Sequence, residues 1–225
     1  MPIKQQMLRP TRITLGDGVA GGKKSLLSVS LDSFDLMTPA AASTTAISAA
    51  VTGNASTAVT TPLNVVLPAP RSITVTSGGT GASIAAVAVV VTGKNVEGKT
   101  ITESLTPVAA TPGTLSGTKV FHTVTGFTVP VQTGAGATFS VGTGNNFGIG
   151  FRNLSVTQVR LLKTVVATGV ESLVAPASTN FSTTVVEDNW VTLDATAAGT
   201  SKYRVYAFNY NWQLNPTNDN PNYGF

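Results

Sequence analysis

The chain has no cysteine and a single histidine, His122. Without cysteine, neither disulfide bonds nor thiolate metal sites are available. A serine hydrolase needs a base beside its nucleophile and a third group to orient that base. His122 lies between Phe121 and Thr123 in a predicted strand, and no G-x-S-x-G motif is present. We therefore expect no enzymatic activity and interpret His122 as a structural or interface residue.

Carboxylates are also scarce, with ten in 225 residues. The oxygen ligands that a metal could use are Asp17, the Glu187–Asp188 pair and Asp219, and none follows the spacing of a calcium loop. These residue types are common in turns. The Glu187–Asp188 pair is predicted to point to opposite faces of a strand, which does not suit the facing carboxylates of a glycosidase. We expect no metal and no other cofactor.

Two glycine-rich stretches lack the third glycine of a dinucleotide-binding fingerprint. They are SGGTGAS, at residues 77–83, and GTGNNFGIG, at residues 142–150. No phosphate-binding G-x-x-x-x-G-K-[ST] motif occurs in the chain. Both stretches are therefore predicted to be turns.

Long hydrophobic runs are missing as well. The longest, residues 85–91, is far shorter than the ~20 residues of a membrane helix. The first residues, MPIKQQMLRPTRI, have no continuous apolar segment, so we expect no secretory signal. The sequence predicts a soluble or assembled protein without a membrane partner.

Charged residues make up 11% of the chain, against about 25% in ordinary globular proteins. Such a surface does little to repel neighbouring copies. The net charge of +4 comes from residues 1–24, because the rest of the chain is balanced. The basic residues of this segment are Lys4, Arg9, Arg12, Lys23 and Lys24. They predict a basic arm that reaches an acidic partner, and the alternative is a solvated N-terminus.

Valine, isoleucine, threonine and phenylalanine are abundant, and the runs they form alternate with glycine, proline and asparagine. This pattern is typical of strands and turns. Residues 84–131 are predicted to form a β-meander with strands at 84–92, 99–106 and 119–131, a turn at 93–98 and a loop at 107–117. At 225 residues the chain is long enough to bury a hydrophobic core without disulfide bonds or a structural metal.

Further strands are predicted on both sides of this meander. Pro68 and Pro70 separate two of them and favour an edge or a corner over a central position. Residues 38–58 fit a short helix or an extended loop. The predicted strands are residues 27–31, 63–67, 71–77, 138–141, 154–166, 183–186, 190–193 and 202–214.

About ten strands at short spacing indicate an all-β fold, an antiparallel sandwich or barrel of jelly-roll or Ig-like type. We expect the basic arm at 1–24, a β-sandwich body at 25–214 and an extended tail at 215–225.

The strand at 202–214 places Tyr206, Phe208, Tyr210 and Trp212 on one face, which we expect to be buried in the core or against another subunit. The tail after it is rich in proline and asparagine but ends in Tyr223 and Phe225. We expect the arm and the tail to lie on neighbouring chains and to supply contacts there.

Glu103 shares its parity with Ile101 and Leu105 and should therefore point into the core or an interface. An unpaired charge there is costly, so a partner is expected. The candidates are Lys99, Lys119, His122 or a basic residue of another chain. The alternative is that this apolar face is partly exposed.

The order of segments in 84–150 resembles that of tailed-bacteriophage virion structural proteins. The resemblance is carried by an apolar strand, the turn GKNVEG, the segment KTITESL, a Thr/Gly/Pro loop, GTKVFHTVTGFTV and GTGNNFGIG. It covers roughly a third of the chain and includes no catalytic motif.

The resemblance implies a capsid decoration or cement protein that acts as a homo-oligomer, for which a trimer is one arrangement. Its partners would be the major capsid protein and copies of itself, in a virion assembled in the host cytoplasm, with no specific nucleic-acid binding. Two alternatives remain: a neck, collar or tail component, and a receptor- or carbohydrate-binding module with Trp190, Tyr203 or Trp212 as its platform.

Overall fold

The computed structural model describes residues 5–6, 28–150, 156–182 and 184–211. Within these ranges the chain forms strands and two short 3-10 helices, η1 (Gly81–Ser83) and η2 (Val186–Asp188). None of the described helices is long or apolar enough to cross a membrane. The strands are β1 (Gln5–Gln6), β2 (Ser28–Met37), β3 (Ser43–Thr52), β4 (Val59–Gly79), β5 (Val89–Lys94), β6 (Thr100–Leu105), β7 (Gly113–Val129), β8 (Ala137–Gly148), β9 (Val156–Val165), β10 (Glu171–Val174), β11 (Ser178–Asn180), β12 (Trp190–Thr192) and β13 (Ser201–Asn211).

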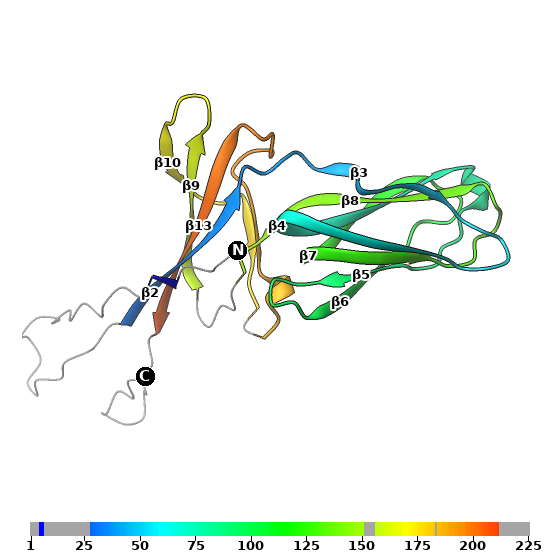
Figure 1. Cartoon of the computed structure of the whole chain (residues 1–225), viewed down its shortest axis with the longest axis horizontal. Coiled ribbons are helices and arrows are strands. Elements are labelled where there is room, and N and C mark those ends of the chain that lie inside the picture. Colours follow the sequence, from blue (N-terminus) through cyan, green and yellow to red (C-terminus); the bar gives the residue numbers. More distant parts are fainter. Residues whose placement is uncertain (1–4, 7–27, 151–155, 183, 212–225) are drawn as a thin grey trace, which may run out of the picture.

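The strands form two antiparallel sheets, which confirms the predicted all-β class. One sheet has five strands in the order β1-β2-β13-β9-β10. The other has eight strands in the order β11-β12-β8-β4-β7-β5-β6, with β3 also paired to β8. This second sheet is curled and is called the half-barrel below. Figure 1 shows the half-barrel extending away from the five-stranded sheet.

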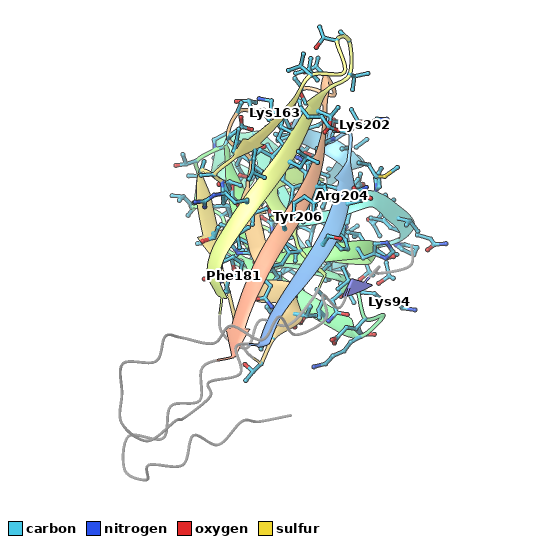
Figure 2. All side chains as sticks on the ribbon, turned by 90° about the vertical axis from the view of Figure 1, so that its left-hand side faces the viewer. Lys94, Lys163, Phe181, Lys202, Arg204 and Tyr206 are labelled. Carbon is cyan, nitrogen blue, oxygen red and sulfur yellow. The ribbon has the colours of Figure 1, made fainter. Side chains whose placement is uncertain are left out.

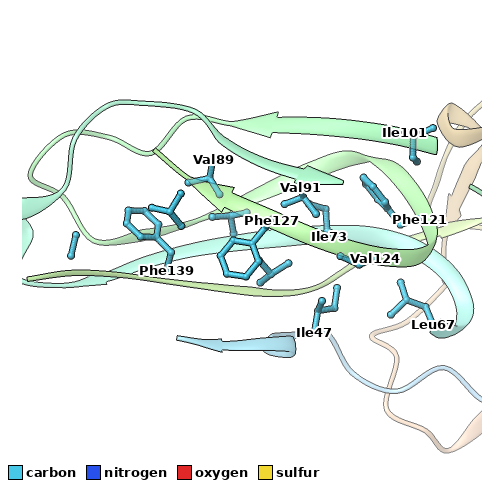
Figure 3. Close-up of a cluster of buried hydrophobic side chains, with 14 of the residues drawn as sticks. Ile47, Leu67, Ile73, Val89, Val91, Ile101, Phe121, Val124, Phe127 and Phe139 are labelled. Atoms are coloured by element: carbon cyan, nitrogen blue, oxygen red, sulfur yellow. The ribbon is translucent and has the colours of Figure 1, made fainter. Parts of the chain in front are cut away.

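The concave side of the half-barrel encloses the larger hydrophobic core (Figure 3). Alternate residues of β5 and β6 point inward, among them Val89, Val91 and Ile101. Phe121, Phe127 and Phe139 are fully buried between them. Burying a side chain of this size contributes about 2–3 kcal/mol each, so the alternation of the sequence accounts for the stability of this sheet.

A second core lies between the inner face of the five-stranded sheet and the end of the half-barrel. Leu161 and Val205 come from the five-stranded sheet, and Phe147 and Val191 come from the half-barrel. All four are buried. The body predicted at 25–214 therefore contains two cores, and the half-barrel contributes to both.

The pairings of β4 with both of its neighbours, β7 and β8, shift register where the two cores meet. The pairing of β4 with β7 jumps from Val66 to Arg71, so the segment between them, which includes Pro68 and Pro70, bulges out of the ladder. Proline has no N–H to donate, so a bulge tolerates it. The predicted strands 63–67 and 71–77 are thus one long central strand. The predicted edge position is wrong, because β4 lies between β8 and β7, and the prolines instead lie in a bulge of this central strand.

The connectivity of residues 84–131 differs from a meander. The strand predicted from residue 84 begins only at Val89, after η1. β6 returns beside β5 as predicted, but β7 pairs with the other side of β5 and with β4. The third strand begins at Gly113, not at Lys119, because its first residues pair with the end of β4.

Three other local predictions are wrong. Residues 43–52 are strand β3, where a helix or a loop was expected. The stretch GTGNNFGIG lies mostly in β8, since pairing with β3, β4 and β12 outweighs its turn-forming composition. The strand expected at 183–186 is absent from the described part of this segment, where η2 begins at Val186.

Of the two predictions for the face of β13 with Tyr206, burial in the core of its own chain is wrong, and burial against another subunit stays a prediction. Tyr203, Val205 and Ala207 are buried, whereas Tyr206 is half-buried on the outer face. The side chains of Phe208, Tyr210 and Trp212 lie outside the described residues. Each face of this strand combines apolar or aromatic residues with polar ones, Lys202 and Arg204 on one side and Asn209 and Asn211 on the other, so parity alone could not select the buried one.

Candidate interaction surfaces

The five-stranded sheet sets the start of β2 beside the end of β13. In its register, Ser28 at the start of β2 lies opposite Asn211 at the end of β13. The chain before β2 and the chain after β13 therefore meet the sheet at the same end. The predicted contact residues of these segments, Lys4, Arg9, Arg12, Lys23, Lys24, Tyr223 and Phe225, lie outside the described residues.

Part of the predicted arm lies on its own domain. Gln5 and Gln6 form β1, which pairs antiparallel with Asp32 and Leu31 of β2. The prediction that residues 1–24 extend entirely over neighbouring chains is thus wrong for β1.

The outer face of the five-stranded sheet is open and mixed in character (Figure 2). Arg204 donates from Nε and Nη2 to the two carboxylate oxygens of Asp35, at 2.9 and 3.0 Å. This bond to Asp35, followed by one to Tyr206, raises the pKa of Arg204 above its usual value. Both side chains of the ion pair are more than 40% exposed, so its contribution to stability is about 0–1 kcal/mol.

A second ion pair joins Lys163, in β9 of this sheet, to Asp194 in the loop after β12. Lys163 Nζ lies 2.9 Å from Asp194 Oδ2, and Tyr203 Oη donates to Asp194 Oδ1 at 2.9 Å. Partial burial raises the pKa of Asp194, but the bonds from Lys163 and Tyr203 outweigh it, so that the net pKa is lowered.

The lowered pKa of Asp194 predicts an acid-sensitive contribution to stability. A carboxylate whose pKa is lower in the folded chain stabilises it above the unfolded pKa of about 3.9, and this contribution is lost as the pH falls through the folded value. We expect Asp194→Asn to unfold more easily than the wild type at pH 6, by about 1 kcal/mol or less. The difference should shrink below pH 4. Urea unfolding of both proteins between pH 2.5 and 6 tests this, and a difference that grew toward acid would contradict it.

Glu103 is 9% exposed and accepts hydrogen bonds from backbone N–H groups. Its Oε1 receives the N–H of Thr118 at 2.6 Å and that of Lys119 at 3.2 Å. Between Ser116 and Val120 the ladder of β7 with β4 shifts, so these two N–H groups lie in a bulge. The carboxylate thus takes the place of the missing strand partner. The Lys119 amine instead donates to Thr102 O, at 3.0 Å.

Arg71 supplies hydrogen bonds to a second bulge, on the side of β4 that pairs with β8. The ladder of β4 with β8 shifts between Arg71 and Ile73, and the guanidinium donates to Gly144 O from Nε, at 2.9 Å, and from Nη2. Nη1 donates to Ala40 O at 3.1 Å, and the group stacks 4.5 Å from the Phe147 ring centre. Burial lowers the pKa of Arg71 to about 10. The sequence analysis missed this residue, although an arginine directly after a proline-rich apolar run was the available signal.

A buried amide links two connections of the half-barrel, the β5–β6 turn and the 3-10 helix η2 between β11 and β12. Asn95, in the β5–β6 turn, donates from Nδ2 to Glu187 Oε2 at 3.1 Å, while its Oδ1 accepts the N–H groups of Glu97 and Lys99. Asn95 and Glu187 are 1% and 7% exposed. Because Glu187 belongs to η2, the predicted Glu187–Asp188 strand pair does not form. Glu187 connects elements of the fold.

The remaining candidates do not converge on one another. His122 is half-buried in β7, and Asp17 and Asp219 lie outside the described residues. Within the described ranges, no three histidine or acidic residues gather as metal ligands. Tyr203 is buried in the second core, so it cannot serve as an exposed sugar platform. Trp190 is half-buried with an unpartnered ring N–H, and Trp212 is outside the described residues.

Comparison with known proteins found no matching family model, curated protein or solved structure.

Proposed function

We propose that this chain is a non-enzymatic structural protein of a tailed-phage virion, a capsid decoration or cement protein that bridges major capsid subunits as a homo-oligomer. The observation that carries the proposal is the register of β2 with β13, which sets Ser28 at the start of β2 opposite Asn211 at the end of β13. The basic residues of 1–24 precede β2 in sequence and the aromatic tail follows β13, so both are joined to the same end of one sheet. A contact region assembled from both ends, with the half-barrel as its rigid support, suits a protein that acts by burying surface on its neighbours.

The character of the two ends suggests how such a contact would form. Five of the chain's 14 basic residues lie in residues 1–24, against one acid, and a basic segment is attracted to an acidic surface over about 8–10 Å at physiological salt. Tyr223 and Phe225 would add apolar anchors, because aromatic residues are enriched at the centres of interfaces. The body needs no chemistry of its own for this role.

The electrostatic part is tested with the basic residues of the arm. Replacing Lys4, Arg9, Arg12, Lys23 and Lys24 with glutamine should reduce occupancy on purified particles and flatten its dependence on salt. Occupancy is measured by sedimentation with particles between 50 and 500 mM NaCl. The matched control replaces Lys94, Lys99 and Lys202, which are exposed on the body, and should leave occupancy unchanged. Equal occupancy of the arm variant and the wild type would contradict the proposal.

Copy number separates this function from its closest alternative. A decoration protein is present in hundreds of copies per particle, and a neck, collar or tail ring in about a dozen. Quantitative mass spectrometry of virions against the major capsid protein provides the ratio. A carbohydrate-binding module would instead bind a glycan array through Trp190, and Trp190→Ala would abolish that binding.

A further inference from the structure

The antiparallel pair of β2 and β13 is the part of the sheet that a pull on the chain ends reaches first. Its register runs from Ser28 opposite Asn211 at one end to Met37 opposite Tyr203 at the other, and Figure 1 shows the two strands side by side. Residues 1–27 precede this pair in sequence and residues 212–225 follow it. Tension between the two ends of the chain therefore acts on Ser28 and Asn211, which are neighbours at the same end of the ladder.

The load at this end is directed along the hydrogen bonds of the pair. Bonds between antiparallel strands are perpendicular to the strands, so a force that draws Ser28 away from Asn211 stretches the nearest bonds and leaves the others unloaded. The residue pairs then separate one after another. Within the described ranges, β2 has only β1 on its other side, paired at Leu31 and Asp32. No second long strand holds β2 in the sheet there.

The larger hydrophobic core does not depend on this pair. Every residue of the half-barrel core belongs to strands β3 to β8 or to the connections between them, and none comes from β2, β9, β10 or β13. By contrast, Leu36 of β2 and Val205 of β13 belong to the second core. Separating β2 from β13 therefore opens the second core and leaves the half-barrel core closed. Parts of a protein with separate cores open at different free energies.

We propose that β2 and β13 form a force-sensitive joint: tension at the chain ends unzips this pair first and extends the chain while the half-barrel remains folded. The segments outside the half-barrel are residues 28–42 and 193–211. At ~3.5 Å per extended residue they supply at most about 120 Å. A protein held at both ends would therefore lengthen under load before its main body unfolded. This joint goes beyond the proposed function and does not depend on it, because the register and the two cores are properties of a single chain.

Optical tweezers with handles on the two termini of the full chain test the order of opening. We expect a first extension of at most about 120 Å, followed at higher force by the release of residues 43–192, about 500 Å at the same length per residue. A single step of the combined length would overturn the proposal. A first step of several hundred ångströms would also overturn it, because the half-barrel would then open before the β2–β13 pair.

The direction of pulling supplies a matched control. Thr200 is exposed and directly precedes β13. Because the chain has no cysteine of its own, Thr200→Cys gives a single attachment point at the opposite end of the ladder from Ser28. Handles at this cysteine and at the N-terminus draw β2 and β13 past each other along their length, so the bonds between them share the load.

At the same loading rate, the force of the first step should be at least about twofold higher in this second geometry, since forced opening follows the unfolding rate of the loaded contact. Thr200→Cys pulled by its two termini should behave as the wild type, which shows that the substitution itself leaves the sheet unchanged. Equal forces in the two geometries would overturn the proposal, because sequential unzipping requires that the force depend on the direction of pulling.

Discussion

Replacing Arg71 with methionine is expected to lower the free energy of unfolding by about 2–4 kcal/mol. Methionine keeps most of the packing against Phe147 but leaves the carbonyl oxygens of Gly144 and Ala40 without their donors. Gly144 lies in a bulge, so the neighbouring strand has no N–H in register to replace the guanidinium. Removal of one buried charge opposes this loss, but two buried carbonyl oxygens left without donors outweigh it.

Lysine at the same position separates charge from geometry. Arg71→Lys keeps the positive charge but cannot donate to Gly144 and Ala40 from a planar fork, so we expect it to recover less than half of the loss. Urea unfolding monitored by circular dichroism measures all three proteins. If Arg71→Met unfolded within about 0.5 kcal/mol of the wild type, Arg71 would not hold the bulge of β8.

The second large effect concerns Glu103 and the bulge of β7. Glu103→Leu is expected to cost about 2–4 kcal/mol, since two backbone N–H groups lose their acceptor in a partly buried position. Glu103→Gln keeps one carbonyl oxygen in place and should cost about 1 kcal/mol, because the bonds lose their charge.

Gly117 supplies an independent test of this geometry. A Cβ at Gly117 would overlap the Glu103 carboxylate, lying 2.7 Å from its Cδ, whereas a Cβ at Gly113 on the same strand meets nothing within 4 Å. Gly117→Ala should therefore destabilise by about 2 kcal/mol and Gly113→Ala by less than about 0.5. In a Glu103→Ala background the cost of Gly117→Ala should fall by at least about 1 kcal/mol. Additive costs would show that the carboxylate does not occupy this space.

The two bulges explain how one sheet serves two cores. Arg71 and Glu103 act on the two neighbours of β4 at nearly the same level, where the half-barrel core ends and the second core begins. Each supplies from a side chain the hydrogen bonds that the ladder loses. Removing either side chain leaves backbone groups without a hydrogen-bond partner, so both residues are expected to be sensitive to substitution.

Local patterns in the sequence were sufficient for much of the fold. The β-class, the inward face of β6 and the turn at Asn95 follow from side-chain alternation and turn residues, whose causes lie within a few positions of one another. The burial of Glu103 followed from its parity with Ile101. Its acceptance of backbone N–H groups did not, because the bulge that exposes them arises from pairing between β4 and β7, which are distant in sequence.

By itself, the sequence determined an all-β chain without cysteine, poor in charge, with its net positive charge in residues 1–24. The tertiary structure decided which face of β13 is buried, that residues 43–52 are a strand, that β7 crosses to the far side of β5 and that β10 is left as an open edge. These features depend on which strands become neighbours. That choice is made by the packing of two whole sheets around their cores, and no local run of residues records it.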